Sequence, residues 1–227
     1  MKTNLIIGLL LLSTWSSFAQ DTSFIFKNTA NGVYHAIFIE QKPDSKYYDW
    51  IADLNFKQLE QKNYSTSIKS LKGKNSKPLA KYDLGDLPRR WCLLYRYNGQ
   101  FYLYSPSDYM GNENVAITDS TYNICYSDGP LTNRIIAFAK PNAATYQFKL
   151  SGYNNTQKTI RIHMVDKKRG IAVFENPAAE PKQRYRFMVQ ADKAKNFPMI
   201  INYCKTQKQL EFEGFDKVDF AKWIGKK

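Results

Sequence analysis

The chain has 227 residues, of which 43% are hydrophobic, and 33 lysines and arginines against 20 acidic residues give a formal net charge of +13. A chain of this length and apolar content can bury a sizeable core, and its three cysteines exclude a disulfide-rich scaffold. The basic charge favours anionic partners such as lipid head groups, acidic glycans or an anionic envelope surface.

Residues 1–19 have the features of a secretory signal peptide. Lys2 gives a positive start, Leu5 to Leu12 form an apolar run, and Ala19 is a small residue suited to cleavage. The run is too short to span a membrane and no later run is longer, so no transmembrane segment is expected. We expect one exported domain over residues 20–227, in a bacterial periplasm or envelope or secreted, whose net charge falls from +13 to +12 with the loss of Lys2.

The next part of the chain mixes strands with less regular segments. Residues 24–26 and 33–40 are expected to be strands. In the second strand His35 shares a side with three aliphatic residues, which makes it a better site candidate than His163, the other histidine, which is expected at the surface. Residues 43–62 favour a helix over an alternating strand, and residues 63–81 are expected to form a long, exposed, basic loop.

The strongest structural signal is a hairpin over residues 91–105. Asn98-Gly99 joins two aromatic runs and is the dipeptide that a type I′ turn prefers. The two-residue turn predicts Tyr95 opposite Tyr102, Leu94 opposite Leu103 and Leu93 opposite Tyr104. One face then carries Trp91, Leu93, Tyr95, Tyr97, Tyr102 and Tyr104, and the other carries Cys92, Leu94, Phe101, Leu103 and, near the tip, Arg96.

Neither face of this hairpin is polar, so both must be covered. In one alternative a loop, a helix or a second sheet covers the face that is not in the core. In the other, the tyrosine face lines a cavity or groove, because tyrosine combines apolar area with a hydroxyl group. Arg89 and Arg90, which precede the hairpin, can hold a carboxylate or phosphate of a ligand or pair with Asp83 or Asp86.

The rest of the chain predicts short strands separated by turns, at the spacing of a sandwich or barrel. Two strands alternate clearly: Tyr146, Phe148 and Leu150 are expected to face inward, and so are Tyr185, Phe187 and Val189. Arg184 and Arg186, which alternate with the second set, are expected to point outward. Gly170 is expected to close a bulged hairpin. Residues 215–225 predict an amphipathic helix that docks against the sheet. The strands are expected at residues 115–118, 122–126, 134–139, 145–150, 159–165, 171–174, 183–189, 199–204 and 210–212.

The sequence carries no motif of a known catalytic, phosphate-binding or metal site, so no cofactor and no metal are expected. Aromatic and basic residues interleave, but alternation places them on opposite sides of a strand, which does not favour nucleic acid as a partner. The three cysteines, Cys92, Cys125 and Cys204, are expected to be unbridged thiols, with one disulfide as the alternative. The carboxylates near strand ends are Glu40, Asp119, Asp128 and Glu175.

These observations predict an all-β fold, a single antiparallel β-barrel or closed β-sandwich of about ten to twelve short strands with one or two short helices. In outline it resembles the lipocalin-like barrels, which also end with a helix after the last strands. Gly32-Val33-Tyr34 is the nearest approach to their Gly-x-Trp signature, so no site residue is carried over.

The predicted function is non-catalytic binding of a small lipophilic or anionic amphiphilic ligand in an aromatic-lined cavity or groove. The alternatives are an envelope glycan hydrolase that uses the strand-end carboxylates and an adhesion or protein-interaction module. The predicted ligand-binding residues are Trp91, Tyr95, Tyr97, Tyr102, Tyr104, His35, Arg89 and Arg90.

Overall fold

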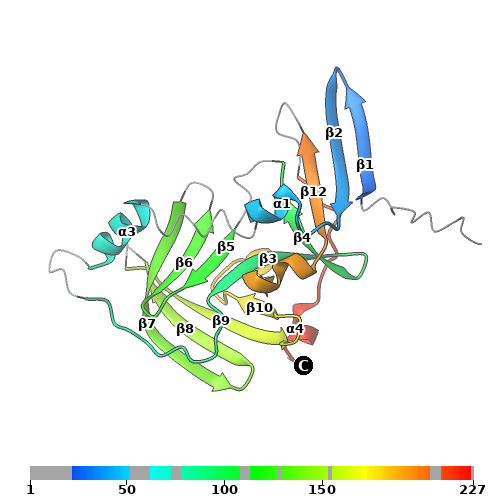
Figure 1. The fold of residues 1–227 in the computed structure, drawn as a ribbon. Coiled ribbons are helices and arrows are strands. Elements are labelled where there is room, and N and C mark those ends of the chain that lie inside the picture. The colour runs from blue at the N-terminus through cyan, green and yellow to red at the C-terminus, as the bar shows by residue number, and fades with distance from the viewer. Residues whose placement is uncertain are drawn as a thin grey trace, which may run out of the picture.

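Figure 1 shows the chain as a computed structural model that describes residues 22–51, 62–72, 78–107, 113–126, 129–152, 155–204 and 211–225. The expected signal peptide lies outside these residues. The strands are β1 (Thr22–Ala30), β2 (Val33–Glu40), β3 (Arg90–Tyr97), β4 (Gln100–Ser105), β5 (Asn114–Ile117), β6 (Thr121–Tyr126), β7 (Gly129–Asn142), β8 (Thr145–Ser151), β9 (Gln157–Asp166), β10 (Ile171–Glu175), β11 (Tyr185–Gln190) and β12 (Met199–Cys204). The helices are α1 (Lys46–Asp49), α3 (Lys62–Lys72), α4 (Phe220–Trp223) and the 3-10 turns η4 (Pro181–Gln183) and η5 (Ala191–Asn196).

Eight of these strands close into an antiparallel barrel. This confirms the predicted all-β fold and shows that the fold is a barrel rather than a closed sandwich. The order around the barrel is β3-β11-β10-β9-β8-β7-β6-β5, and β5 pairs back onto β3. This closing contact is short, with Arg90 opposite Ala116 and Trp91 opposite Val115. Closure pairs the backbone groups that an open sheet would leave at its edges.

Strand β3 belongs to two sheets. Its first residues pair within the barrel, and residues 95–97 pair with β4, which leads on to β12, β2 and β1. These four strands, β4, β12, β2 and β1, form an outer sheet that rises from one side of the barrel (Figure 1). Strand β12 runs parallel to β4 and antiparallel to β2.

The Asn98-Gly99 turn is confirmed, since both residues have positive φ, 48° and 77°. Tyr95 lies opposite Tyr102 as predicted, but the pairing ends there. The expected pairing of Leu94 with Leu103 and of Leu93 with Tyr104 is wrong, because β3 turns into the barrel and pairs with β11, while β4 leaves to pair with β12. A hairpin turn sets the register only for as long as the two strands stay together.

The barrel wall has an apolar core on each side. The inner core contains Trp91, Phe148 and Leu150, and the last two confirm the predicted inward face of β8. Outside the wall, a second core lies beneath α1, η5, β12 and α4 and contains Phe187 and Val189 of β11. The expectation that these two residues face inward is therefore wrong, since alternation shows which residues share a face and not which face is inside.

The helices differ from the sequence expectation in two places. Of residues 215–225, which were expected to be helical, only Phe220–Trp223 form α4, and residues 215–219 are not helical. Residues 62–72 form α3 rather than a loop, and Tyr64, Ile68 and Leu71, at helical spacing, give it one apolar side. Leu71 is buried, and the Tyr64 hydroxyl lies 3.2 Å from the Thr121 Oγ1. Of the helix expected at 43–62, the structure shows α1, while residues 52–61 lie outside the described part. The predicted docking of the C-terminal helix is confirmed by Trp223, whose ring contacts Phe187 and Phe101.

Most of the remaining strand predictions agree with the structure within two residues, but β1 (Thr22–Ala30) and β7 (Gly129–Asn142) are longer than the expected 24–26 and 134–139. The hairpin after β9 has the expected left-handed Gly170, with φ of 73°, and an irregular register next to it. The strand expected at 210–212 is wrong for its described residues 211 and 212, which are not in a strand, and residue 210 lies outside the described part. All three cysteines carry thiols without disulfides, as expected.

Candidate functional site

One end of the barrel is open and charged. We call this end the barrel mouth. It is a cavity of about 110 Å³ lined from the starts of β5, β9 and β11 and the end of β10, where these antiparallel strands reach the same rim. The charged side chains that line it are Glu113, Lys158, Glu175, Arg184 and Arg186. At the opposite end, Leu84 and Leu87 from the segment before β3 join the inner core and fill the barrel.

The cations of the mouth are only partly compensated by acids. Arg186 pairs with Glu113, and burial lowers the pKa of Arg186. Burial also lowers the pKa of Lys158, because a desolvated ammonium group disfavours its charged form. The buried Nε of Arg184 has no hydrogen-bond partner among the described residues. A small anion would therefore complete the bonding of groups that the fold has already desolvated.

Glu175 lies at the rim, and its side chain forms hydrogen bonds on the outer side of the barrel wall. Its carboxylate accepts hydrogen bonds from His163 at 3.0 Å, Arg161 at 3.4 Å and Tyr185 at 3.3 Å. The His163 side chain is only 13% exposed, so the expectation of a surface histidine is wrong. This partly buried, charge-assisted cluster holds β9, β10 and β11 together at the mouth.

An aromatic groove of about 370 Å³ lies beside the mouth, between β3, β11 and the C-terminal segment, which we define as residues 211–219. Tyr95 stacks on Phe215 with ring centroids 4.3 Å apart, and burial raises the pKa of Tyr95 to about 12. The mouth and the groove share Glu113 and Arg186, so this ion pair is the boundary between them. The five aromatic side chains of the groove are Tyr95, Tyr185, Phe187, Phe215 and Phe220, and Arg96 and Lys182 add positive charge.

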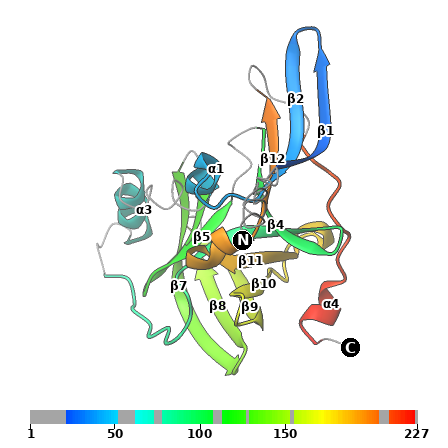
Figure 2. The ribbon, with the colours of Figure 1, turned by 45° about the vertical axis from the view of Figure 1, so that its right-hand side comes forward.

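The C-terminal segment is fastened to the β3–β4 turn and follows one side of the molecule down to α4 (Figure 2). The Asp216 carboxylate accepts hydrogen bonds from the backbone N–H groups of Asn98 at 3.0 Å and Gly99 at 2.9 Å. In return the Asp216 N–H donates to the Arg96 carbonyl at 2.8 Å. This clamp holds Phe215 against Tyr95 and so forms one wall of the groove.

The structure does not gather the predicted tyrosine face around one cavity. Tyr95 alone lines the groove, whereas Trp91 is fully buried in the inner core, where its indole N–H donates to the Pro88 carbonyl at 2.9 Å. Tyr97, Tyr102 and Tyr104 lie in a third core with Phe212 and Phe215 of the C-terminal segment, and Tyr95 also packs against this core. The face is divided because β3 passes from the barrel wall into the outer sheet.

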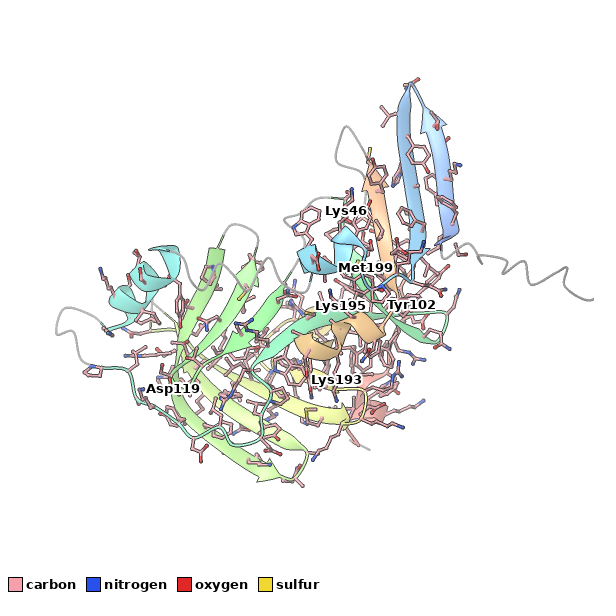
Figure 3. All side chains as sticks on the ribbon, in the orientation of Figure 1. Lys46, Tyr102, Asp119, Lys193, Lys195 and Met199 are labelled. Carbon is pink, nitrogen blue, oxygen red and sulfur yellow. The ribbon has the colours of Figure 1, made fainter. Side chains whose placement is uncertain are left out.

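The other predicted ligand residues lie elsewhere. His35 is in the outer sheet, where its Nε2 lies 2.7 Å from the Asn202 Oδ1. Arg89 precedes β3 and Arg90 is its first residue; both lie at the filled end of the barrel, beside β5, and are exposed. The hydrogen bond from Lys81, and to a smaller extent the charge of Arg89, lower the pKa of Asp119. Figure 3 shows Asp119 far from Tyr102 of the outer sheet.

Asp86 does not form the ion pair that was expected with Arg89 or Arg90. Its carboxylate bonds to Lys140 at 2.6 Å and to the Tyr146 hydroxyl at 2.8 Å. The strand-end carboxylates do not converge either. Glu40 accepts from the Lys42 N–H in the outer sheet, Asp119 pairs with Lys81, and Asp128 lies outside the described residues.

Sequence reasoning missed the cations of the mouth. The expectation that Arg184 and Arg186 point outward is wrong, because the apolar residues opposite them on β11 belong to the outer core. Lys158 shares an alternating face with Ile160 and Ile162, which are in the inner core. That spacing was a usable signal for a lysine at the barrel rim.

Within the described ranges, no group of three or more histidine, cysteine or acidic side chains could hold a metal ion. No helix in that part of the chain is long and apolar enough to cross a membrane. Comparison with known proteins finds no family model, no curated protein and no solved structure that matches this chain.

Proposed function

We propose that this chain is an exported, non-catalytic binding protein whose ligand is a small anionic amphiphile. The apolar part of the ligand lies in the aromatic groove, and its anionic group is held by the cations of the barrel mouth. The observation that carries this proposal is the continuity of the two sites at Arg186 and Glu113. The expected signal sequence supports export.

The sizes and the chemistry of the two sites support this division. At about 370 Å³ the groove falls within the range of about 300–1,000 Å³ typical of ligand pockets, whereas the mouth is too small for more than a head group. Aromatic side chains provide apolar contact area without the cost of ordering long, flexible chains. An anion in the mouth recovers part of the cost of burying Lys158 and Arg184.

The test is isothermal titration of the purified protein with decanoate and, as its uncharged counterpart, decanol. Decanoate should bind more tightly than decanol. Lys158→Met should weaken decanoate binding about tenfold, the size expected for the loss of one desolvated charge contact. Lys149→Met, which removes an exposed lysine of β8, is the matched control and should leave binding unchanged.

Tyr95→Ala should weaken both compounds, since it removes the ring that stacks on Phe215. If neither compound binds, or if Lys158→Met binds decanoate as tightly as the unaltered protein, the proposal fails.

A further inference from the structure

A thiol and an imidazole face each other in the outer sheet, away from the mouth and the groove. Cys204 of β12 lies opposite His35 of β2 in the antiparallel pairing. Opposed residues share one face, with Cβ atoms about 4.5–5.5 Å apart. Both side chains are partly exposed, and Cys204 lines a cavity of about 450 Å³ together with Asn202. Cys204 is therefore open to a small molecule, with His35 opposite it on β2.

A hydrogen-bond network sets the orientation of His35. Glu211 accepts from the Ser107 hydroxyl at 2.9 Å and from the Asn202 Nδ2 at 3.3 Å, and Tyr104 also donates to it. Because an ionised carboxylate only accepts, Asn202 turns its amide nitrogen toward Glu211 and its Oδ1 toward His35. That Oδ1 lies 2.7 Å from the His35 Nε2, so Nε2 carries the proton and the neutral ring keeps an unprotonated Nδ1.

We infer that Cys204 and His35 form a nucleophilic thiol site, positioned by Asn202, that undergoes exchange with small disulfides. His35 takes the proton from the Cys204 thiol, and the thiolate attacks one sulfur of the disulfide. A new bond forms between the Cys204 Sγ and that sulfur while the original sulfur–sulfur bond breaks. The departing thiolate takes the proton back from His35, so the products are a mixed disulfide on Cys204 and one released thiol.

The other two cysteines cannot do this in the folded protein. Cys92 and Cys125 are fully buried, and burial raises the pKa of Cys125 to about 12. The reactive form of a cysteine is the thiolate, so a buried thiol of this kind is inert. The protein thus carries two internal reference thiols for the reactivity of Cys204.

The contacts of His35 come from its own hydrogen-bond network and from the neighbouring strand β1. Glu211 and Tyr104 belong to its own network, and the ring that contacts His35 from β1 is Phe26, 5.1 Å away. Lys27 of β1 lies over the rings of Phe24 and Tyr34, on the other face of the sheet. Glu211 is linked to the His35 ring through the Asn202 amide.

The test follows the reaction of the purified protein with dithionitrobenzoate by release of the coloured thiol, and locates the label by peptide mass mapping. Cys204 should be labelled first, and Cys92 and Cys125 only after unfolding. His35→Gln should slow the labelling of Cys204 about tenfold at neutral pH and move the pH midpoint of the rate toward the value of an ordinary thiol, about 8.5. Asn202→Ala should shift the midpoint in the same direction.

Tyr34→Phe is the matched control, because Tyr34 precedes His35 on β2 and faces the other way; it should leave the rate and the midpoint unchanged. The inference fails if His35→Gln has the rate and pH profile of the unaltered protein, or if Cys92 or Cys125 reacts first. If His35→Gln unfolds, the inference is tested by the pH midpoint of Cys204 labelling in the unaltered protein alone. In that case, a midpoint at the ordinary thiol value overturns the inference and a lower midpoint supports it.

Discussion

Asp216→Ala removes the clamp between the C-terminal segment and the β3–β4 turn. A hydrogen bond to a charged group contributes about 1.5–3 kcal/mol, and Asp216 makes two, to the N–H groups of Asn98 and Gly99. Both bonds are exposed to solvent and share one carboxylate, so the lower end of that range applies to the pair. We expect the free energy of unfolding to fall by about 1.5–2 kcal/mol.

Urea denaturation measures this change, and amide hydrogen exchange localises it. Exchange should accelerate at Asn98 and Gly99, whose N–H groups lose their acceptor, while amides of the inner core such as Phe148 keep their relative protection. Asp219→Ala is the matched control, since the ion pair between Asp219 and Lys222 is exposed and its loss should change the stability little. Unchanged unfolding and unchanged exchange at the turn in Asp216→Ala would refute the clamp.

Two further predictions concern the barrel. Phe148→Ala empties a fully buried position of the inner core and should lower the free energy of unfolding in urea by about 3–5 kcal/mol. Phe24→Ala, at an exposed position on the edge strand β1, should lower it far less. Equal losses of stability in the two variants would contradict the assignment of the core. Burial lowers the pKa of Lys158 below its usual 10.5, so the unfolded chain holds this proton more tightly, and the lysine destabilises the fold at neutral pH by an amount that shrinks as the pH rises toward 10.5. Lys158→Met should therefore raise the urea midpoint of unfolding at pH 7, and this gain in stability should disappear in alkali. A lower midpoint at pH 7 would show that burial of Lys158 does not destabilise the fold.

Local chemistry determined much of the strand pattern. Asn98-Gly99 needs only its own backbone preferences to form the turn, and the alternation of Tyr146, Phe148 and Leu150 needs only the pleat of one strand. These signals act over a few residues, and the structure confirms them. The helix α3 also had a local signal, the spacing of Tyr64, Ile68 and Leu71, which the abundance of lysines around it obscured.

Tertiary structure alone decided where these faces point. The outer face of β11 is as apolar as an inner one because a second core covers it, so alternation by itself placed Arg186 on the wrong side of the wall. His35 and Asn202 are 167 residues apart in sequence, and only the order of strands in the outer sheet brings them together. Side-chain alternation is a property of a single strand, whereas barrel closure and strand order depend on pairing between distant segments, which no local pattern encodes.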